Sequence, residues 1–334
     1  MICVEQERRS PARRVGVHAS ACHPSKLKLE LQPPSIASES GVSRSVLARE
    51  RAQRAHALLA DCHLCAHDCG VNRLVGERGL CHAGAETRFF SAQTEVTDEL
   101  ELIPTFAIAM SGCDMRCDFC ITGASSWNPR SGDALVATRG QGVPPTSLRR
   151  GVAATQLAAK ARAALRNGAR TVMVMGGEPT IHLPAALELV SLLPDTAKLV
   201  WKTNAHGSAQ ARELLDGMFD VWLTDFKFGN DACAQRLSKT PDYVRIVREN
   251  LFWAAEHSEL IVRHLLMPGH VDCCWRPVAE WLAENLPGVK VNLRSGFWPA
   301  WHAARHAELR RAVSTQESDR AFALASAFHL NLIP

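Results

Sequence analysis

Three closely spaced cysteines are the residues of this sequence whose type and spacing most directly indicate chemistry. They form the stretch Cys113-Asp-Met-Arg-Cys117-Asp-Phe-Cys120, a C-x3-C-x2-C pattern with Phe119 directly before the last cysteine. An iron–sulfur cluster with a complete protein shell takes four thiolates. Three thiolates therefore leave one iron of a [4Fe–4S] cluster open to a small molecule. A structural zinc site is the alternative, but zinc needs four ligands in a closed shell, so the count favours the cluster.

A second motif follows a short apolar segment further along the chain. Residues 171–175 read Thr-Val-Met-Val-Met and lead into Gly176-Gly177-Glu178-Pro179. The apolar run predicts a buried strand. Two glycines at its carboxyl end would let a ligand approach the backbone closely. Because parallel α/β sheets bind ligands at the carboxyl ends of their strands, we expect the cysteine loop and this turn at one site.

Another group of cysteines lies nearer the amino terminus and has its own ligand-like spacing. Its members, in a C-x2-C-x3-C-x11-C pattern, are Cys62, Cys65, Cys69 and Cys81. So short a segment cannot bury a core, and a metal is expected to hold it together. Four thiolates suit both zinc and a second [4Fe–4S] cluster, and the cluster is favoured because the chain already requires cluster assembly. The neighbouring side chains that would serve as replacement ligands are His63, His67 and His82.

The elements that must position these motifs follow from an alternation of strand-like and helix-like segments after about residue 100. Such alternation predicts βαβ units and a parallel sheet. Six units imply an α/β fold, a partial (β/α)6 TIM-like barrel whose mouth holds the cluster and the substrate. The expected strands are 105–110, 171–175, 198–202, 220–226, 260–267 and 289–293. The expected helices are 147–167, 184–193, 209–218, 232–238, 243–257, 276–285 and 319–329.

Length, composition and charge limit the classes of protein to which the chain can belong. Its 334 residues, 46% of them hydrophobic, allow one large domain and a small accessory one. No segment has the uninterrupted apolar length of a membrane span, so no membrane association is expected. The formal charge of +4 is small, and the basic excess lies mostly in the first 60 residues. This distribution does not indicate nucleic-acid binding.

Cysteine usage indicates metal sites rather than disulfides. Seven of the 12 cysteines fall in the two groups described above, which fits metal binding in a reducing cytoplasm. The other cysteines, including a vicinal pair, are expected to be ordinary thiols. They are Cys3, Cys22, Cys233, Cys273 and Cys274.

Composition also suggests three parts of the chain. Residues 1–50 contain prolines, serines and scattered arginines without periodicity, and are expected to form a disordered tail. Residues 51–95 form the cysteine-rich, metal-binding segment. Residues 96–334 form the barrel.

Together these motifs resemble the radical S-adenosylmethionine (SAM) superfamily, and in particular pyruvate formate-lyase activating enzyme-like proteins with an extra amino-terminal cysteine segment. The matching stretches cover about four-fifths of the chain and are 62–81, 113–120, 176–179, 203–204, 225–227, 262–265 and 268–269. The resemblance implies that Cys113, Cys117 and Cys120 hold a [4Fe–4S] cluster whose fourth iron is chelated by SAM. It also implies reductive cleavage of SAM to a 5′-deoxyadenosyl radical, with a flavodoxin or ferredoxin as electron donor.

The resemblance further implies which residues contact SAM. Gly176 and Gly177 would line its methionine end, and Glu178 would receive its ammonium group. Other positions of the family surround the ribose, carboxylate and adenine. The remaining residues implied to bind the cofactor are Phe119, Thr203, Asn204, Asp225, Lys227, Arg263 and Leu265.

Two departures from the activating enzymes leave the substrate open. Those enzymes place an acid directly before Thr203-Asn204, where it helps to form a cation site, and this chain has Lys202 there. The lysine ammonium is therefore expected to replace the cation. Residues 121–129 and 294–299, both expected at the barrel mouth, also differ from the usual segments.

Three functions remain open at this point. Hydrogen abstraction from a glycine of a partner enzyme is placed ahead on the family resemblance alone; it needs an open mouth through which a protein loop can enter, and a six-stranded partial barrel provides one. Abstraction from a peptide or small metabolite is the second; a small substrate needs a lid, and residues 125–145 are long enough for one. A metal-stabilised interaction module or electron carrier is the non-enzymatic alternative. It predicts a fourth protein ligand for the cluster and no use for residues 176–179.

Overall fold

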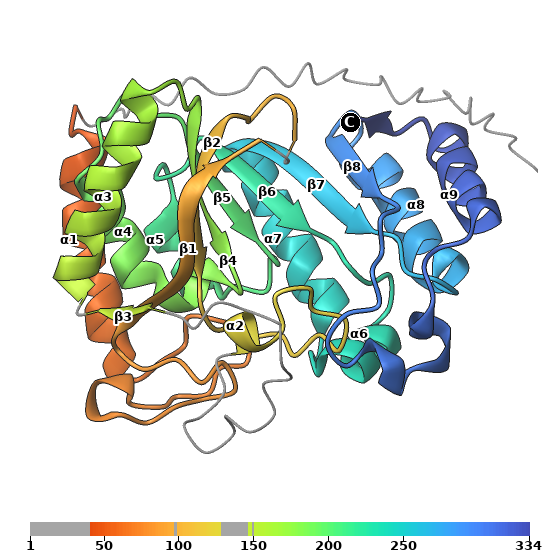
Figure 1. Ribbon diagram of the computed structural model, residues 1–334, viewed down its shortest axis with the longest axis horizontal. Helices are drawn as coiled ribbons and strands as arrows, with labels where there is room; N and C mark the ends of the chain where they lie inside the picture. Colours follow the sequence, from red (N-terminus) through yellow and green to blue (C-terminus); the bar gives the residue numbers. More distant parts are fainter. Residues whose placement is uncertain (1–40, 97–98, 128–145, 149) are drawn as a thin grey trace, which may run out of the picture. The chain divides into compact units, whose positions relative to one another are not determined.

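A nine-stranded, mostly parallel sheet organises the computed structural model, which describes residues 41–96, 99–127, 146–148 and 150–334 (Figure 1). The strand order among these residues is β3-β1-β2-β4-β5-β6-β7-β8-β9. The strands are β1 (Thr87–Glu95), β2 (Thr105–Met110), β3 (Thr146–Leu148), β4 (Thr171–Gly176), β5 (Leu199–Thr203), β6 (Val221–Asp225), β7 (Glu259–Leu265), β8 (Lys290–Arg294) and β9 (Asn331–Leu332). From β2 through β4 to β9, neighbours pair in parallel, whereas β1 is antiparallel to β2 and β3.

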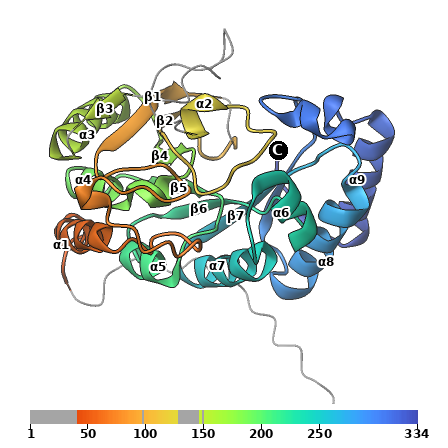
Figure 2. The same cartoon turned by 90° about the horizontal axis from the view of Figure 1, so that it is seen from below.

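The predicted α/β fold is confirmed: β2 and β4–β8 supply the six parallel strands of the expected partial barrel. The described helices are α1 (Arg44–Ala57), α2 (Ala124–Trp127), α3 (Arg150–Arg166), α4 (Leu183–Ser191), α5 (Ala209–Leu215), α6 (Asp231–Ser238), α7 (Tyr243–His257), α8 (Arg276–Asn285) and α9 (Thr315–Ala327). Helices α4, α5, α7 and α8 lie along one face of the sheet (Figure 2). This is the arrangement that βαβ crossovers of one handedness produce.

The core has two layers because successive side chains of a strand point to opposite faces of the sheet. In β4, Val172 and Val174 belong to the large cluster that the sheet shares with the helices. Met173, between them, belongs to a small separate cluster on the inner side of the sheet. That inner cluster also contains Val200, Val221, Leu223 and Ile261, which come from the neighbouring strands.

Most element boundaries lie within two residues of those expected, but several elements were not predicted. Strands β1, β3 and β9 extend the sheet at its two edges. Helix α9 begins four residues earlier than expected, because Ser314 and Glu317 form a capping box at its start. The segment Ser-Thr-Gln-Glu at residues 314–317 has the capping-box pattern and could have predicted this start.

The expected boundary at residue 50 falls inside α1, so part of the predicted tail is helical. The helix presents Ala48, Ala52 and Ala55 at one-turn spacing, and all three are buried. It packs against α4, and Arg44 secures its first turn through Asp220, with 2.9 Å between Nη1 and Oδ2. Residues 1–40 of the predicted tail, and residues 128–145 of the predicted lid, lie outside the described residues.

No helix in the described ranges is both long and apolar enough to span a membrane.

Candidate active site

The cysteine loop begins where β2 ends, beside a cavity at the carboxyl edge of the parallel strands. All six residues of β2 are buried, and residues 111–119 of the loop that follows are buried as well. The cavity has a volume of about 630 Å³, and Cys113, Cys117 and Cys120 all line it. Small-molecule sites typically measure about 300–1,000 Å³. The three predicted thiols thus share one cavity, at the sheet edge where parallel α/β folds bind ligands.

The two glycines after β4 allow that strand end to press directly against the cysteine loop. A Cβ on Gly176 would lie 2.2 Å from the backbone nitrogen of Met110, and a Cβ on Gly177 would lie 1.9 Å from the carbonyl oxygen of Gly112. Backbone hydrogen bonds close the contact, from Gly177 N to Met110 O at 2.8 Å and from Glu178 N to Gly112 O at 2.9 Å. Any side chain at either glycine would therefore push the loop away from the strand.

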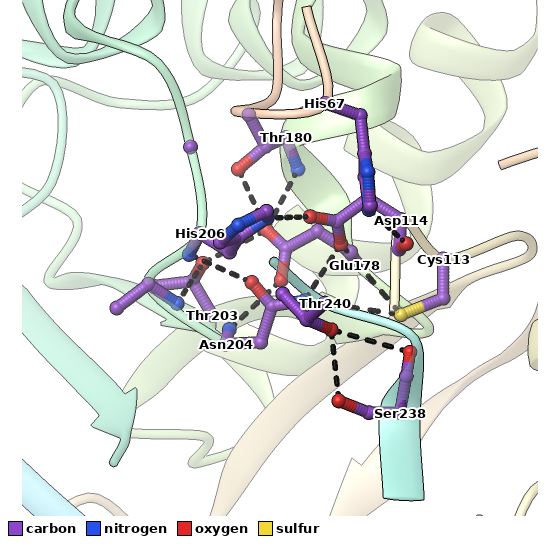
Figure 3. Close-up of polar contacts among 12 residues, drawn as sticks. His67, Cys113, Asp114, Glu178, Thr180, Thr203, Asn204, His206, Ser238 and Thr240 are labelled. Carbon is purple, nitrogen blue, oxygen red and sulfur yellow. Dashed lines mark hydrogen bonds and ion pairs between the residues drawn. The ribbon is translucent and has the colours of Figure 1, made fainter. Parts of the chain in front are cut away.

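Glu178 lies behind the cavity wall and is not among the described residues that line it. Its Oε1 accepts hydrogen bonds from the Thr180 and Thr203 hydroxyls and from Thr180 N, and its Oε2 accepts one from Asn204 N at 2.8 Å (Figure 3). Burial, followed by the nearby negative charge of Asp114, raises the pKa of Glu178 to about 7. These contacts hold Glu178 between two strand ends, and its expected contact with the SAM ammonium stays a prediction.

Charged side chains from three neighbouring strands line the cavity opposite the cysteines. Asp225 and Lys227 form an ion pair after β6, and the Arg263 guanidinium on β7 lies 3.9 Å from Asp225 and 3.2 Å from Glu99. Burial favours a neutral Asp225, but Lys227 and Arg263 outweigh it and hold its pKa below the usual range. The pKa of Lys227 is raised despite burial, through Asp225. The pair therefore stays charged, beside Lys202 on β5.

The other predicted SAM contacts, Phe119, Thr203, Asn204 and Leu265, also line the cavity. Residues 294–299 were expected at the barrel mouth, and Arg294 and Trp298 of that segment line the cavity. Sequence reasoning missed other lining residues, which include Met115, Asn292 and Phe322. The polar positions in the short apolar strand 289–293 and directly after it were a usable signal, whereas the position of Phe322 on α9 depends on the tertiary fold alone.

Two thiols of the cluster loop, Cys113 and Cys117, have a pKa raised by their surroundings, which favours the protonated form when no metal is bound. Burial, followed by the charge of Asp114, raises the pKa of the Cys113 thiol well above its ordinary value. Burial also raises the pKa of Cys117 to about 12. A thiol that coordinates a metal is deprotonated, so metal binding here must release protons.

The second cysteine group packs against the same part of the barrel. Cys62, Cys65 and Cys81 are buried and Cys69 is exposed. Cys65 forms an isolated bridge with Gly207, just after β5. The buried Arg73 guanidinium donates to Gly84 O at 2.6 Å and lies 3.7 Å from the Cys62 sulfur.

Within the described residues, neither cysteine group forms a set of three ligand atoms that all lie within 4.8 Å of one another. Sulfurs arranged around a single tetrahedral ion would be about 3.8 Å apart.

A polar network that the sequence did not indicate joins this segment to the cluster loop (Figure 3). The buried Asp114, next to Cys113, lies 2.9 Å from His206 Nδ1 through Oδ2 and accepts from Asn204 Nδ2 at 2.7 Å through Oδ1. His67 Nε2 donates to the Asp114 carbonyl oxygen at 2.8 Å. Burial opposes ionisation, but His206 and Asn204 outweigh it and lower the pKa of Asp114. His67 links the amino-terminal segment to the cluster loop through this bond, and its expected role as a replacement metal ligand stays a prediction.

Comparisons with known proteins agree with this geometry. Residues 108–282, which are 175 of the 334 residues, match the family model described as "Radical SAM superfamily". The chain is 31% identical over 278 residues to "Uncharacterized protein MJ0674" of Methanocaldococcus jannaschii, covering 83% of this chain and 77% of that protein.

Solved structures of SuiB from Streptococcus suis are also similar. The form bound to the precursor peptide SuiA has a TM-score of 0.48 at 14% identity, covering 67% of this chain and 46% of that one. The form bound to S-adenosylmethionine has a TM-score of 0.47 at 14% identity, covering 66% and 47%. The chain thus spans about half the length of these proteins. Since the family model spans more than half of it and includes both the cysteine loop and the Gly176-Gly177 turn, the chain belongs to the radical SAM superfamily.

Proposed function

We propose that this protein is a radical SAM enzyme that abstracts hydrogen from a polypeptide substrate at the cavity lined by Cys113, Cys117 and Cys120. Family membership implies a [4Fe–4S] cluster and SAM, and indicates an enzyme rather than an interaction module or electron carrier. When bound, this pair would supply a 5′-deoxyadenosyl radical through one-electron cleavage of SAM. The observation that carries the proposal is the cavity itself, which combines three thiols with a set of half-buried, paired charges.

The protein's own residues fit this pair of cofactors. Three cavity-lining thiols match the three iron ligands that leave one iron open. Gly176 and Gly177 expose backbone to the cavity, since neither has a side chain to cover it. Asp225 would accept hydrogen bonds from ribose hydroxyls, and Lys202 would face the SAM carboxylate in place of a monovalent cation. Because the charged side chains that line the cavity are held by their neighbours, they would orient SAM without changing their own positions.

The rim of the cavity supports a polypeptide as the substrate. Ile121, Trp298 and Phe322 line the cavity, yet each is exposed, Trp298 to 70%. Exposed apolar side chains clustered at a polar site mark a surface for another macromolecule. A glycine of a partner enzyme is the form of this substrate that the resemblance to activating enzymes favours. A modified peptide or a small metabolite is the alternative.

Reconstitution under anaerobic conditions tests the chemistry. With iron, sulfide, SAM and dithionite, the protein should release methionine and 5′-deoxyadenosine in equal amounts. The Cys113→Ala variant should release neither, while Glu280→Gln, an exposed change on α8, should behave as the parent protein does in this reaction. If the reconstituted protein leaves SAM intact, the proposal is wrong.

Electron paramagnetic resonance tests the substrate. A glycyl radical doublet on a co-incubated partner enzyme is expected, and Trp298→Ala should weaken its formation while SAM cleavage without partner is unchanged. If the product is instead a modified peptide whose yield also depends on Trp298, the polypeptide substrate is supported and the glycyl radical product is ruled out. Turnover with a small metabolite that is insensitive to Trp298→Ala would overturn the polypeptide assignment.

For the second cysteine group we propose an auxiliary [4Fe–4S] cluster that serves folding or electron supply, not SAM binding. Its support is the spread of the thiols, which is wider than a tetrahedral zinc site requires. Metal analysis of the Cys113/Cys117/Cys120 triple alanine variant separates the options. We expect the triple variant to retain iron. The same variant with Cys62→Ala and Cys65→Ala added should contain none. Zinc released by the same two substitutions would mean a structural clip instead.

A further inference from the structure

Four ligand-type side chains outside the cavity meet at one point beside α6. Cys233 lies near the start of α6, which follows β6, and Cys273 and Cys274 lie in the single helical turn η5 (Val271–Trp275), which follows β7. His270 directly precedes that turn. Since β6 and β7 are neighbours in the sheet, residues 40 positions apart in the chain come together at its carboxyl edge. These three cysteines were expected to be ordinary thiols, and nothing in the sequence indicated that the tertiary structure places them together with His270.

The distances within this group match one tetrahedral ion. The Cys273 sulfur lies 3.9 Å from both the Cys233 and the Cys274 sulfur. His270 Nδ1 lies 3.7 Å from Cys233, 3.2 Å from Cys273 and 3.4 Å from Cys274. With Zn–S bonds near 2.3 Å and Zn–N bonds near 2.1 Å, a tetrahedron has edges of about 3.8 Å between sulfurs and about 3.6 Å between sulfur and nitrogen. The sulfur separations are far above the roughly 2.05 Å of a disulfide bond.

We propose that Cys233, His270, Cys273 and Cys274 form a structural zinc site, separate from the radical SAM cavity and from the amino-terminal cysteines. Three thiolates and one imidazole are a donor set that zinc takes in closed, four-coordinate structural sites. His270 and Cys274 are almost wholly buried. With four protein ligands, no position is left for water or substrate.

The backbone around the site is adapted to hold these ligands. A Cβ on Gly229 would lie 2.5 Å from the Cys274 carbonyl oxygen, so the turn before α6 can approach η5 this closely only with glycine. Asn230 caps α6 by accepting from Cys233 N at 2.8 Å. The same side chain donates to the Cys273 carbonyl at 2.7 Å and lies 3.3 Å from the Cys233 sulfur. The cap thus fixes two ligands that belong to different elements.

The far side of the imidazole faces the ion pair of Arg236 and Glu308. His270 directs Nδ1 to the three sulfurs, and its Nε2 lies 3.5 Å from Arg236 Nη2 and 3.7 Å from the Glu308 carboxylate. Glu308 is itself held by Arg236 of α6, with 2.6 Å between Oε1 and Nη1. A carboxylate behind the second ring nitrogen orients a metal-binding histidine and strengthens it as a ligand.

The site would fix the helix on which the cluster loop rests. The carbonyl oxygens of Leu237 and Ser238, at the end of α6, accept hydrogen bonds from Asp118 N at 2.9 Å and Arg116 N at 2.8 Å. Zinc between α6 and η5 would therefore stabilise the loop that carries Cys117 without taking part in the chemistry there.

Zinc content is the first test. The full-length protein with Cys233→Ser and Cys274→Ser should contain one zinc equivalent fewer than the parent protein. The Cys113/Cys117/Cys120 triple alanine variant should keep that equivalent. In Glu308→Gln, zinc affinity should fall about 10-fold or more, while Glu280→Gln, an exposed change on α8, should leave it unchanged. Unaltered zinc content in the double serine variant overturns the proposal.

Alkylation mapping of the unmutated protein tests the site without relying on variants that fail to fold. Iodoacetamide should label Cys233 and Cys273 slowly in the zinc-loaded protein and at least tenfold faster after a chelator has removed the zinc. Equal labelling in both states, or a disulfide joining any two of the three cysteines in freshly isolated protein, would contradict the zinc site.

Discussion

At the scale of single residues, Gly177 shows how closely the two halves of the site meet. A Cβ there would lie 1.9 Å from the Gly112 carbonyl oxygen, which is backbone and cannot swing aside. Gly177→Ala should therefore displace the start of the cysteine loop, cost about 1–3 kcal/mol of unfolding free energy and lower the iron bound after reconstitution. Urea denaturation and iron analysis measure the two effects.

Gly151→Ala is the matched control for this substitution. Gly151 lies in α3, and an added Cβ would meet no atom within 4 Å. Alanine is a better helix former than glycine by about 1 kcal/mol, so this variant should gain stability and keep its iron. A loss of iron equal to that of Gly177→Ala would mean that the loop does not depend on this close approach.

A substitution at Glu178 separates two roles that the sequence could not distinguish, positioning of the backbone and direct contact with SAM. Glu178→Gln replaces one acceptor oxygen with an amide that faces existing donors, and one donor left unsatisfied costs about 1–3 kcal/mol. If Glu178 positions the Thr203-Asn204 backbone, the melting temperature should fall in the absence of SAM, and SAM should still bind. Calorimetry with and without SAM measures both quantities, with the exposed Glu280→Gln as control. Normal stability combined with abolished SAM binding would instead favour direct contact with the SAM ammonium.

At the scale of elements, Asp114 couples the cysteine loop to the turn after β5. Its carboxylate meets His206 and Asn204, and its carbonyl oxygen meets His67 from the amino-terminal segment. In Asp114→Asn only the amide oxygen can accept a hydrogen bond, whereas His206 and Asn204 both donate to the carboxylate of the parent protein. Hydrogen bonds to charged groups contribute about 1.5–3 kcal/mol each, so unfolding free energy should fall by about 2 kcal/mol.

Chemical denaturation measures this loss, and Asp319→Asn, an exposed change on α9, should change stability by less than about 0.5 kcal/mol. The Asp114→Asn variant should also become more sensitive to proteolysis between residues 62 and 81, because the segment loses part of its anchor. A variant as stable and as resistant as the parent protein would show that these elements are held by packing alone.

At the scale of the whole molecule, two buried imidazoles set the response to acid. Burial, reinforced by Arg73, lowers the pKa of His182 to about 3, and burial lowers the pKa of His264 to about 4. Both folded values lie below the unfolded value near 6.5. The stability they contribute is thus complete above pH 6.5 and is lost as the pH falls below it, by about 1.4 kcal/mol per pH unit for each histidine.

His182→Gln tests this dependence, because glutamine can still donate to the Ser111 carbonyl that His182 Nε2 reaches at 2.7 Å. Unfolding free energies at pH 6.5 and pH 5 should differ by about 2 kcal/mol less in the variant than in the parent protein. The exposed His329→Gln should leave the difference unchanged. An unaltered pH dependence in His182→Gln would mean that other groups control acid unfolding.

The sequence alone determined the parts of this protein that depend on local pattern. Six apolar segments separated by helical periodicity were enough to predict the parallel strands, and α7 and α8 occur at the predicted residues. Two local patterns were enough to predict the site, the spacing of Cys113, Cys117 and Cys120 and the pair of glycines at the end of β4. Both are visible in the sequence because the number of ligands and the absence of a side chain are local properties. The superfamily followed from those two motifs.

Only the tertiary structure decided what depends on contacts between distant segments. The two-residue β9 pairs with β8 and has no pattern of its own. Whether Glu178 faces the cavity or the protein depends on Thr203 and Asn204, which lie about 25 residues away in the chain. Cys233 and Cys273 are separated by 40 residues and lie within 3.9 Å because β6 and β7 are adjacent. Such proximity is a consequence of sheet order, which no local spacing of residues records.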